Sequence, residues 1–579
     1  MQRQRLAGRL ARAVGAACLA GALSLGLWGC DRGDHRNAAE QDGHESGKQA
    51  DVKAQTGSKQ QQGDPYLWLE EIQGEKALAW VRKQNERTLK ILGGDPRYQP
   101  AYDRILAIYQ SPDRIAYGQL RAGNVDNFWQ DREHVRGLWR RTTLASYKTD
   151  SPQWEILLDI DKLAAEEGEN WVWKGASCLP PAYTRCMVSL SRGGGDAVVV
   201  REFDTSTGRF ITDGFRLPEG KQWLAWLDAD HLLVATPHGG GMKNTSGYPR
   251  TIRIWTRGEP LEKARTIFTG AETDAFVFPV VEHAADGSRE AFVVQAPDFF
   301  HQTVYHVGDD GTLHRLPLPD DVDFKGVFDG HVIVQLRSAW APGKTTGRLA
   351  EGSVVSIPLK ALIAGDVSGA TTVMAPSRRV TVRDATIGRN GVYIAILDNV
   401  KGRLVEAVRA PGGWRLRPVS LPGDGTVSVV SADPFTDAVL VNYESFLKPD
   451  TLYVIEGNGE PEAIKALPPR FDASQYAVDQ FFAESEDGTK VPYFLIHRKD
   501  MPHDATTPTI LYGYGGFEIA LTPQYLSPMA IEWLKAGGAY AIANIRGGGE
   551  FGPRWHRAAL KENRPKAYAD FAAVAYDLV

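Results

Sequence analysis

Residues 509–517, with the sequence Thr-Ile-Leu-Tyr-Gly-Tyr-Gly-Gly-Phe, join a short apolar run to a glycine-rich turn. An apolar hairpin pattern precedes them, because Phe481–Ala483 and Val491–Ile496 flank the turn sequence Glu-Asp-Gly-Thr. A helical pattern near Ile531–Lys535 and an apolar strand pattern over Tyr540–Ile545 follow. The order of hairpin, strand, helix and strand predicts the beginning of an α/β sheet.

The middle of the chain, residues 113–467, has almost no helical periodicity and many short alternating apolar runs. A unit made of a turn and a strand recurs at Asp230–Val234, Glu290–Val294, Asp329–Val334, Asn390–Ile394 and Asp437–Val441. Equivalent positions of these units lie 60, 39, 61 and 47 residues apart, near the blade period of a β-propeller. At roughly 50 residues per four-stranded blade, this region has room for about seven blades. A stack of β-sandwiches would also give short strands but no such repeat, so we favour the propeller.

The composition is that of a folded protein. Hydrophobic residues make up 43% and charged residues 24% of the 579 residues, which argues against a wholly disordered or polytopic membrane chain. The length exceeds that of a single core and predicts several domains. The net charge of -5 provides no positive field for phosphates, so nucleic acid is not an expected partner.

The first 30 residues have the layout of a signal peptide, with four arginines before the uncharged stretch Ala13–Trp28. That stretch ends in Leu-Trp-Gly-Cys at residues 27–30, which resembles a bacterial lipobox, although Trp28 departs from the small residue usual there. We therefore expect an exported, periplasmic lipoprotein that is acylated at Cys30. A simple secreted protein and an uncleaved anchor are the alternatives. Residues 31–63 contain one large apolar side chain, Val52, and this predicts a disordered linker.

Cys178 and Cys186 are the two cysteines outside the predicted signal peptide. They flank a short Pro-Pro-containing loop between two strand-like runs, so in an oxidising compartment they predict a disulfide across a hairpin. Two buried free thiols are the alternative. No further histidine or cysteine lies nearby at zinc-binding spacing.

Residues 547–552, Gly-Gly-Gly-Glu-Phe-Gly, fit the dinucleotide-binding pattern G-x-G-x-x-G and follow a strand-like run. Pro553–His556 follow in place of a helix that could pack on the strand, and no second βαβ half is present. We therefore expect a tight loop after a parallel strand, without a bound dinucleotide.

Four segments in the same order closely resemble the prolyl oligopeptidase family: Asp64–Glu70, Asp487–Pro492, Tyr512–Phe517 and Ala543–Gly552. Members of that family are serine peptidases that cleave short proline-containing peptides, usually after proline. Their propeller admits peptides and excludes folded proteins. The resemblance therefore implies short peptides as partners and acyl transfer as the reaction.

The resemblance also implies how the domains are divided. An α/β-hydrolase domain would be built from both ends of the chain, with residues 64–112 supplying a helical part and residues 468–579 the start of the sheet. Residues 113–467 would form the propeller, expected to have seven blades. The helical part includes Glu75–Leu92, where apolar residues share one helical face and Gly93-Gly94 supplies the stop.

Two residues are carried over from the family to a candidate site. Tyr514 matches the tyrosine whose hydroxyl helps form the oxyanion hole, and Phe517 matches an aromatic side chain that lines the substrate pocket. Ordinary packing of either ring is the alternative. We expect Arg546 and Glu550 to hold their loop by a salt bridge rather than to touch substrate. No cofactor or metal is expected.

The catalytic triad of the family is not found in these 579 residues. Acyl transfer requires a serine on a strand-to-helix elbow, followed by an aspartate and a histidine, and the sequence contains no G-x-S-x-G. The helical pattern Tyr568–Leu578 reaches Val579 without a stop signal. We therefore expect a truncated, monomeric form that is inactive alone. A propeller module that binds peptides without cleaving them is the alternative.

Overall fold

The computed structural model describes residues 64–71, 74–343 and 347–579. The predicted signal peptide, the lipobox cysteine and the linker lie outside these residues. The described residues fall into two units, residues 64–111 and residues 112–579. No helix among them is long and apolar enough to cross a membrane.

The first unit consists of three helices: η1 (Leu67–Glu70), α2 (Glu75–Leu92) and α3 (Tyr98–Tyr109). Helix α2 has the bounds that the sequence predicts, and Gly93 caps its end by donating its N–H to the carbonyl of Leu89 at 2.9 Å. Trp68 of η1 lies edge-on to Trp80 of α2, with ring centroids 6.4 Å apart. The contact between the two tryptophan rings packs η1 against α2.

Seven antiparallel sheets follow one another along the described residues between Gly118 and Ala466. Six sheets have four strands in sequence order, and the second has a fifth because β9 also pairs with β7. The first three sheets are formed by β1 (Gly118–Arg121), β2 (Asn124–Trp129), β3 (Leu138–Thr143) and β4 (Glu155–Asp159); β5 (Trp171–Cys178), β6 (Arg185–Arg192), β7 (Val198–Asp204), β8 (Arg209–Phe210) and β9 (Arg216–Gly220); and β10 (Trp223–Trp226), β11 (His231–Ala235), β12 (Thr251–Thr256) and β13 (Arg265–Thr269).

The remaining four sheets continue the same pattern. They are formed by β14 (Phe276–His283), β15 (Arg289–Ala296), β16 (Thr303–Val307) and β17 (Leu313–Arg315); β18 (Val322–Phe328), β19 (His331–Leu336), β20 (Val354–Pro358) and β21 (Thr371–Met374); β22 (Val380–Ile387), β23 (Val392–Asp398), β24 (Lys401–Ala410) and β25 (Gly413–Val419); and β26 (Thr426–Ala432), β27 (Ala438–Glu444), β28 (Thr451–Glu456) and β29 (Glu462–Ala466). Short helices interrupt the connections: α4 (Leu144–Tyr147), α5 (Ile160–Glu167), η2 (Leu261–Lys263) and α6 (Leu359–Ile363).

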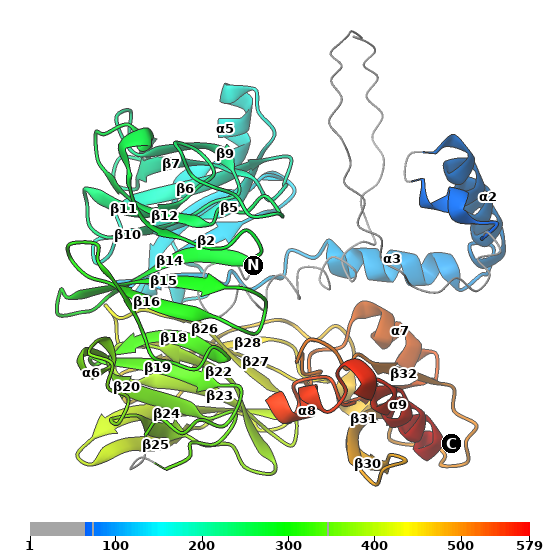
Figure 1. Ribbon diagram of the computed structural model, residues 1–579. Coiled ribbons are helices and arrows are strands. Elements are labelled where there is room, and N and C mark those ends of the chain that lie inside the picture. Colours follow the sequence, from blue (N-terminus) through cyan, green and yellow to red (C-terminus); the bar gives the residue numbers. More distant parts are fainter. Residues whose placement is uncertain (1–63, 72–73, 344–346) are drawn as a thin grey trace. The chain divides into compact units, whose positions relative to one another are not determined.

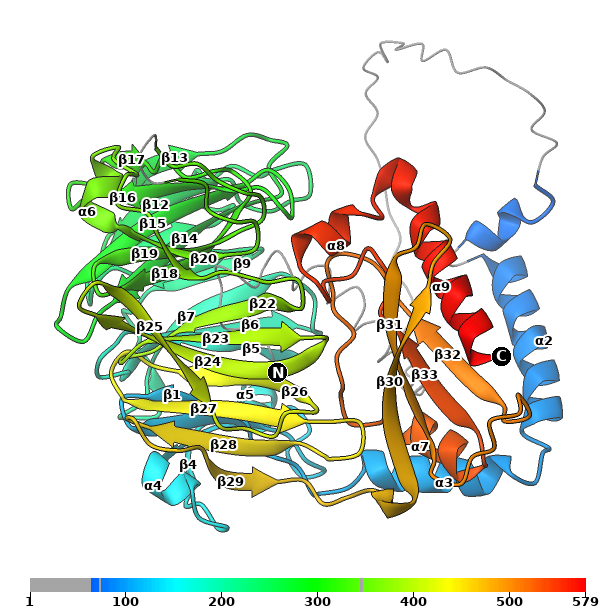
Figure 2. The same cartoon turned by 90° about the horizontal axis from the view of Figure 1, so that it is seen from below.

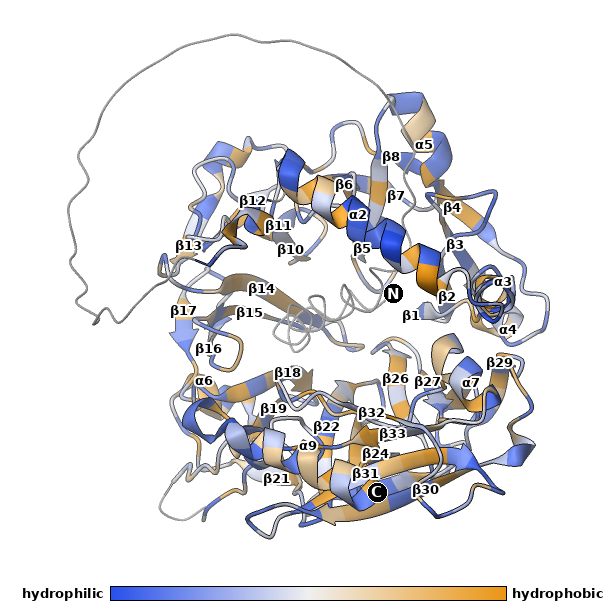
Figure 3. Cartoon of the chain, turned by 90° about the vertical axis from the view of Figure 1, so that its right-hand side faces the viewer, coloured by the Kyte–Doolittle hydropathy of each residue, from blue (hydrophilic) through white to orange (hydrophobic). Residues whose placement is uncertain are grey.

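Apolar side chains between neighbouring sheets form the core of this region. Phe292 of β15, for example, packs with Phe324 of β18 in one cluster that joins the fourth and fifth sheets. A further cluster contains Leu120 of β1 and Leu440 of β27, so the last sheet packs against the first and the ring closes. Figure 3 shows the sheets in this ring coloured by hydropathy. The prediction of a β-propeller is therefore confirmed.

The C-terminal part is a mixed sheet in the order β30-β31-β33-β32. Its elements are η3 (Ala473–Gln475), β30 (Tyr476–Glu484), β31 (Lys490–Arg498), β32 (Thr509–Gly513), α7 (Pro528–Lys535), β33 (Ala539–Ala543), α8 (Pro553–Arg557), η4 (Lys561–Asn563) and α9 (Pro565–Leu578). Strands β32 and β33 are parallel, with α7 between them in sequence. The predicted α/β sheet is thus confirmed (Figures 1 and 2).

The two faces of this sheet bury different helices. Leu495 and Ala541 belong to the cluster that includes Val574 of α9, whereas Phe494 and Ile531 of α7 belong to another. Adjacent residues of β31 thus point to opposite faces, as the pleat of a strand requires.

One local prediction is wrong, because a short helix, α8, begins at Pro553 where we expected none. Proline suits the first position of a helix, since its missing N–H has no intrahelical partner there.

Candidate active site

Tyr514 and Phe517 lie on a loop, residues 514–520, that follows β32. Tyr514 is half-buried, and Phe517 is 54% exposed. Phe517 and Glu518 both have left-handed backbone, with φ of 50° and 57°. Residues with side chains seldom adopt this conformation, so the surrounding structure has to hold the loop in place.

Glycines let this loop lie against the second glycine-rich loop, residues 547–549. A Cβ atom at Gly515 would stand 2.7 Å from the carbonyl oxygen of Arg546, and one at Gly547 would meet the carbonyl oxygen of Gly515. Gly547 also has a φ of 95°, which strains any other residue. The glycines of both motifs therefore permit close backbone approach, and this explains the Gly-Gly-Gly run without a bound phosphate.

Arg546 anchors the second glycine-rich loop through two ion pairs. Arg546 is only 5% exposed, and its guanidinium lies 2.6 Å from the carboxylate of Asp570 on α9 and 2.5 Å from that of Asp487 in the β30–β31 turn. Hydrogen bonding to Arg546 holds the pKa of Asp487 well below its usual range. The predicted salt bridge between Arg546 and Glu550 is therefore wrong, because among the described residues two other carboxylates surround the guanidinium.

Glu550 holds the loop by hydrogen bonds instead. Its carboxyl is buried, with the residue 1% exposed, and Oε1 accepts the N–H of Leu521 at 3.0 Å and the side-chain amide of Asn544 at 3.2 Å. Burial raises the pKa of Glu550 to about 7. Glu550 thus ties the second glycine-rich loop to the segment that follows Phe517.

Propeller side chains bind the Tyr514 loop as well. Arg337, which follows β19, forms an ion pair with Glu518 and lies over the ring of Phe300 at 5.0 Å. The carbonyl of Arg337 accepts a hydrogen bond from Arg557 at 2.7 Å, and Arg557 pairs with Glu351 at 2.5 Å. Sequence reasoning missed these contacts, because Arg337 and Glu518 are 181 residues apart and no local pattern marks them.

The last propeller sheet binds the segment that leads from this loop to α7. The Oγ1 of Thr426 donates to the carbonyl of Pro523 at 2.7 Å, and Glu444 accepts the N–H of Tyr525 at 2.9 Å. Burial, and next the negative charge of Asp450, raise the pKa of Glu444 to about 7. The propeller therefore helps to fix both ends of the segment that begins at Glu518.

Two buried histidines have structural partners. The Nδ1 of His556 lies 3.0 Å from the backbone nitrogen of Glu518 and 2.6 Å from the carbonyl oxygen of Gly547. The Nε2 of His497 lies 2.8 Å from the carboxylate of Asp479. His556 therefore adds a further link between the two glycine-rich loops.

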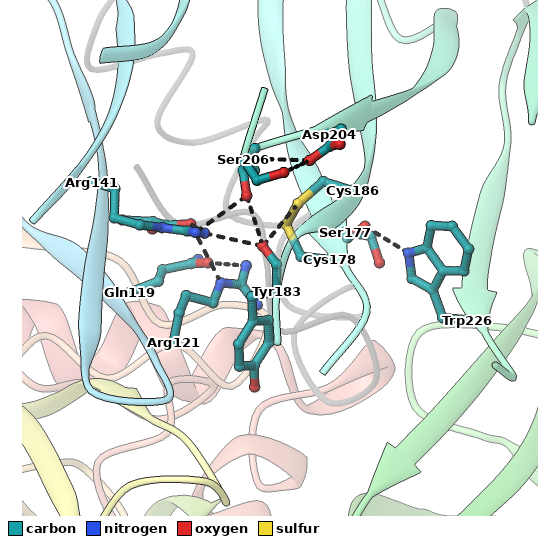
Figure 4. Close-up of a disulfide and its surroundings, with 12 residues drawn as sticks. Gln119, Arg121, Arg141, Ser177, Cys178, Tyr183, Cys186, Asp204, Ser206 and Trp226 are labelled. Atoms are coloured by element: carbon teal, nitrogen blue, oxygen red, sulfur yellow. Dashed lines mark hydrogen bonds and ion pairs between the residues drawn. A yellow bond between two sulfur atoms is a disulfide. The ribbon is translucent and has the colours of Figure 1, made fainter. Parts of the chain in front are cut away.

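Cys178 and Cys186 lie directly opposite each other in the β5–β6 hairpin and are joined by a disulfide (Figure 4). Both are buried, with 7% and 0% of their surface exposed.

Cys30, the predicted lipidation site, lies outside the described residues. Within the described ranges, no three His, Cys, Asp or Glu side chains are grouped so that they could hold a metal ion.

Comparison with known protein families identifies two matching models. The model described as the prolyl oligopeptidase N-terminal beta-propeller domain matches residues 47–466. The model of the prolyl oligopeptidase family matches residues 524–579. Together they cover the ring of sheets and the second half of the α/β part.

Individual relatives match over most of the chain. An uncharacterized peptidase of Sinorhizobium fredii is 42% identical over 89% of this chain and 72% of its own length. A prolyl endopeptidase of Elizabethkingia miricola is 35% identical over 89% of this chain and 70% of its own length. The solved structure of a post-proline cleaving enzyme from Rickettsia typhi has 30% identity and a TM-score of 0.79, and the match covers 88% of this chain and 76% of that one. The chain therefore belongs to the prolyl oligopeptidase family of serine peptidases.

Proposed function

We propose that this chain carries the peptide-binding and oxyanion-binding parts of a peptidase that acts on short proline-containing peptides. The observation that supports this most is the loop that carries both Tyr514 and Phe517, which the second glycine-rich loop and Arg337 of the propeller contact. The names of its relatives agree, since they include prolyl endopeptidases and a post-proline cleaving enzyme.

Tyr514 is the proposed oxyanion donor. A phenol hydroxyl that points at the carbonyl oxygen of a bound peptide stabilises the negative charge that develops there as a nucleophile attacks. One such donor contributes about 3 kcal/mol to the transition state, because a water-poor cavity strengthens the hydrogen bond. A Cβ atom at Gly513 would meet the ring of Phe571, and one at Gly515 would meet Ile545, so these two glycines let the Tyr514 loop pack closely against α9 and the second glycine-rich loop.

Phe517 is the proposed contact for the proline ring. Its side chain is 54% exposed, so apolar surface is available to a ligand. Burial of such surface against a pyrrolidine ring contributes about 25 cal/mol for each Å² removed from water.

We further propose that the 579-residue polypeptide does not hydrolyse peptides by itself. Its sequence contains no G-x-S-x-G elbow, and a hydroxyl donor without a nucleophile and a base does not form an acyl enzyme. The test is a turnover assay with a chromogenic Gly-Pro amide. We expect a rate equal to that of buffer; turnover that Tyr514→Phe reduces would overturn this part of the proposal.

Peptide binding is tested separately, by fluorescence anisotropy of a labelled proline-containing peptide. We expect saturable binding that Phe517→Ala weakens about tenfold, the loss of a partly buried aromatic contact. Phe482→Ala is the matched control, because Phe482 is 44% exposed on β30 and has no proposed role. Equal affinities of the wild type and Phe517→Ala would contradict the assignment.

We also propose that the protein is exported and anchored through a lipid on Cys30, and that it is a monomer. The disulfide between Cys178 and Cys186 supports an oxidising compartment. Labelled palmitate should be incorporated into the wild type and not into Cys30→Ser. Sedimentation velocity of the soluble form should give a single species of the monomer mass.

A further inference from the structure

The propeller ring closes without sharing a strand between its two ends. The first sheet consists of β1–β4 and the last of β26–β29, so in the described residues each sheet is complete within its own stretch of sequence. We call the boundary between these two sheets the seam. Side chains hold it together, including Leu120 and Leu440 in a shared apolar cluster and Lys148, whose Nζ lies 2.6 Å from Glu456.

A loop of the second sheet also reaches the seam. Residues 179–184 connect β5 to β6, and the Cys178–Cys186 disulfide closes their base. Tyr183 in this loop has left-handed backbone, with a φ of 52°, and is 5% exposed. Figure 4 shows its ring extending from the disulfide-bonded loop beside Arg121 of the first sheet, whose guanidinium lies 5.0 Å from the ring centre.

The hydroxyl of Tyr183 bonds to the last sheet. It donates to Oδ1 of Asp433 at 2.6 Å, and Asp433 follows β26. The other oxygen, Oδ2, accepts the N–H of Ala122 in the β1–β2 turn at 2.5 Å. Asp433 is itself 3% exposed. One buried carboxylate therefore joins the last, first and second sheets.

Aromatic packing supports the same bridge. The ring of Tyr183 lies edge-on to that of Phe435, with centroids 6.1 Å apart. Phe435 comes from the last sheet's β26–β27 connection and packs on the apolar cluster of the first and second sheets. The backbone carbonyl of Tyr183 accepts a hydrogen bond from Arg141 of β3 at 3.3 Å. Tyr183 thus contacts both sides of the seam.

We propose that the Cys178–Cys186 disulfide is a redox-sensitive clasp that holds Tyr183 across the seam of the propeller. Reduction by a dithiol breaks the S–S bond with two electrons and two protons, leaves two cysteine thiols and converts the reductant into its own disulfide. The loop at residues 179–184 then loses the covalent closure of its base. The ordering of Tyr183 becomes more costly, because a covalent closure limits the conformations that the free loop can explore.

The consequence is local opening rather than unfolding. The apolar cluster and the Lys148 ion pair remain at the seam after reduction. Reduction weakens the link from the second sheet to Asp433. The backbone amides beside this link, in the first and last sheets, then become less protected against hydrogen exchange. The first and last sheets should therefore open more often in the reduced protein, and the other sheet boundaries should not change.

Hydrogen exchange with mass spectrometry tests the clasp on the full chain, with and without a dithiol reductant. Mass analysis of the peptide that contains Cys178 and Cys186 verifies reduction. We expect reduction to accelerate exchange about tenfold in peptides covering residues 118–126 and 427–440, with no change over residues 276–296. Acceleration confined to residues 172–192, or spread evenly over the propeller, would overturn the proposal.

Tyr183→Phe separates the clasp from general effects of reduction. The oxidised variant lacks only the hydroxyl that reaches Asp433, and it should exchange faster at the seam than the oxidised wild type. Reduction should add little further acceleration at the seam of this variant, because the link is already lost. Tyr305→Phe is the matched control, since the Tyr305 hydroxyl bonds to Gln295 within one sheet at 3.3 Å. Full additivity of Tyr183→Phe and reduction would contradict the clasp.

Discussion

Replacement of Glu550 by Gln should abolish the pH dependence that this residue gives to the stability of the protein. Glu550 is almost fully buried, and its Oε1 accepts hydrogen bonds from Leu521 and Asn544. In the described residues Oε2 has no hydrogen-bond partner. Gln has the same shape and can keep the two bonds to Oε1, but it cannot ionise.

The magnitude follows from the pKa of Glu550, which burial raises from 4.5 to about 7. The folded protein therefore holds this proton over a pH range in which the unfolded chain has released it. Stability from this group is fully present below about pH 4.5 and falls as the pH rises to about 7. The shift corresponds to about 3 kcal/mol, which the wild type loses and Glu550→Gln does not.

Urea unfolding followed by fluorescence, at about pH 4.5, 6 and 8, measures this difference. Glu550→Gln should match the wild type at the lowest pH and be more stable at the highest. Glu484→Gln is the control, because Glu484 is exposed and its hydrogen bond with Lys490 lowers its pKa. Identical pH profiles for the wild type and Glu550→Gln would refute the reasoning.

Replacement of Arg546 by Met should lower the free energy of unfolding, measured in urea, by about 3–5 kcal/mol, because it leaves the carboxylate of Asp570 buried without its cation. The double variant with Asp570→Asn should recover much of this loss. No recovery would argue against a stabilising ion pair between Arg546 and Asp570. Gly547→Ala should lower the midpoint of thermal unfolding more than Gly412→Ala does. Both glycines have positive φ, but a Cβ atom at Gly547 would meet the carbonyl oxygen of Gly515, whereas one at Gly412 would meet nothing within 4 Å. Equal decreases would show that the close approach of the two loop backbones is unimportant. Glu444→Gln should stabilise the protein above about pH 7 and not below about pH 4.5. Burial raises the pKa of Glu444 to about 7, so the wild type loses stability as the pH rises through this range, whereas Gln does not ionise. Urea midpoints at the two pH values measure the difference, and a gain in stability at low pH would contradict the prediction.

Local patterns predicted most of the fold. The bounds of α2 are those expected from its apolar face and the glycines after it, and the alternating runs between residues 113 and 467 form sheets. Such patterns succeed because the pleat of a strand and the turn of a helix impose their periods on nearby residues. Helix α8 shows the limit of this approach. Pro553 occupies its first position, where proline is favoured, but we did not predict a helix there because the residues before it form a glycine-rich loop.

Contacts between distant segments could not be predicted in the same way. Arg546 was expected to pair with the carboxylate nearest in sequence, Glu550, yet it binds Asp487 and Asp570. Carboxylates on three different elements were equally plausible from charge alone, and the packing of α9 against the sheet selects among them. The ion pair from Arg337 to the Tyr514 loop likewise depends on how the propeller meets the sheet.

The location of the peptide site is the central claim, and hydrogen exchange in the presence of a saturating proline-containing peptide tests it most directly. The account predicts that the peptide slows exchange over residues 512–521 and 545–552, and that Phe517→Ala removes this protection at the same peptide concentration. Protection confined to other parts of the chain, with residues 512–521 unchanged, would contradict the account.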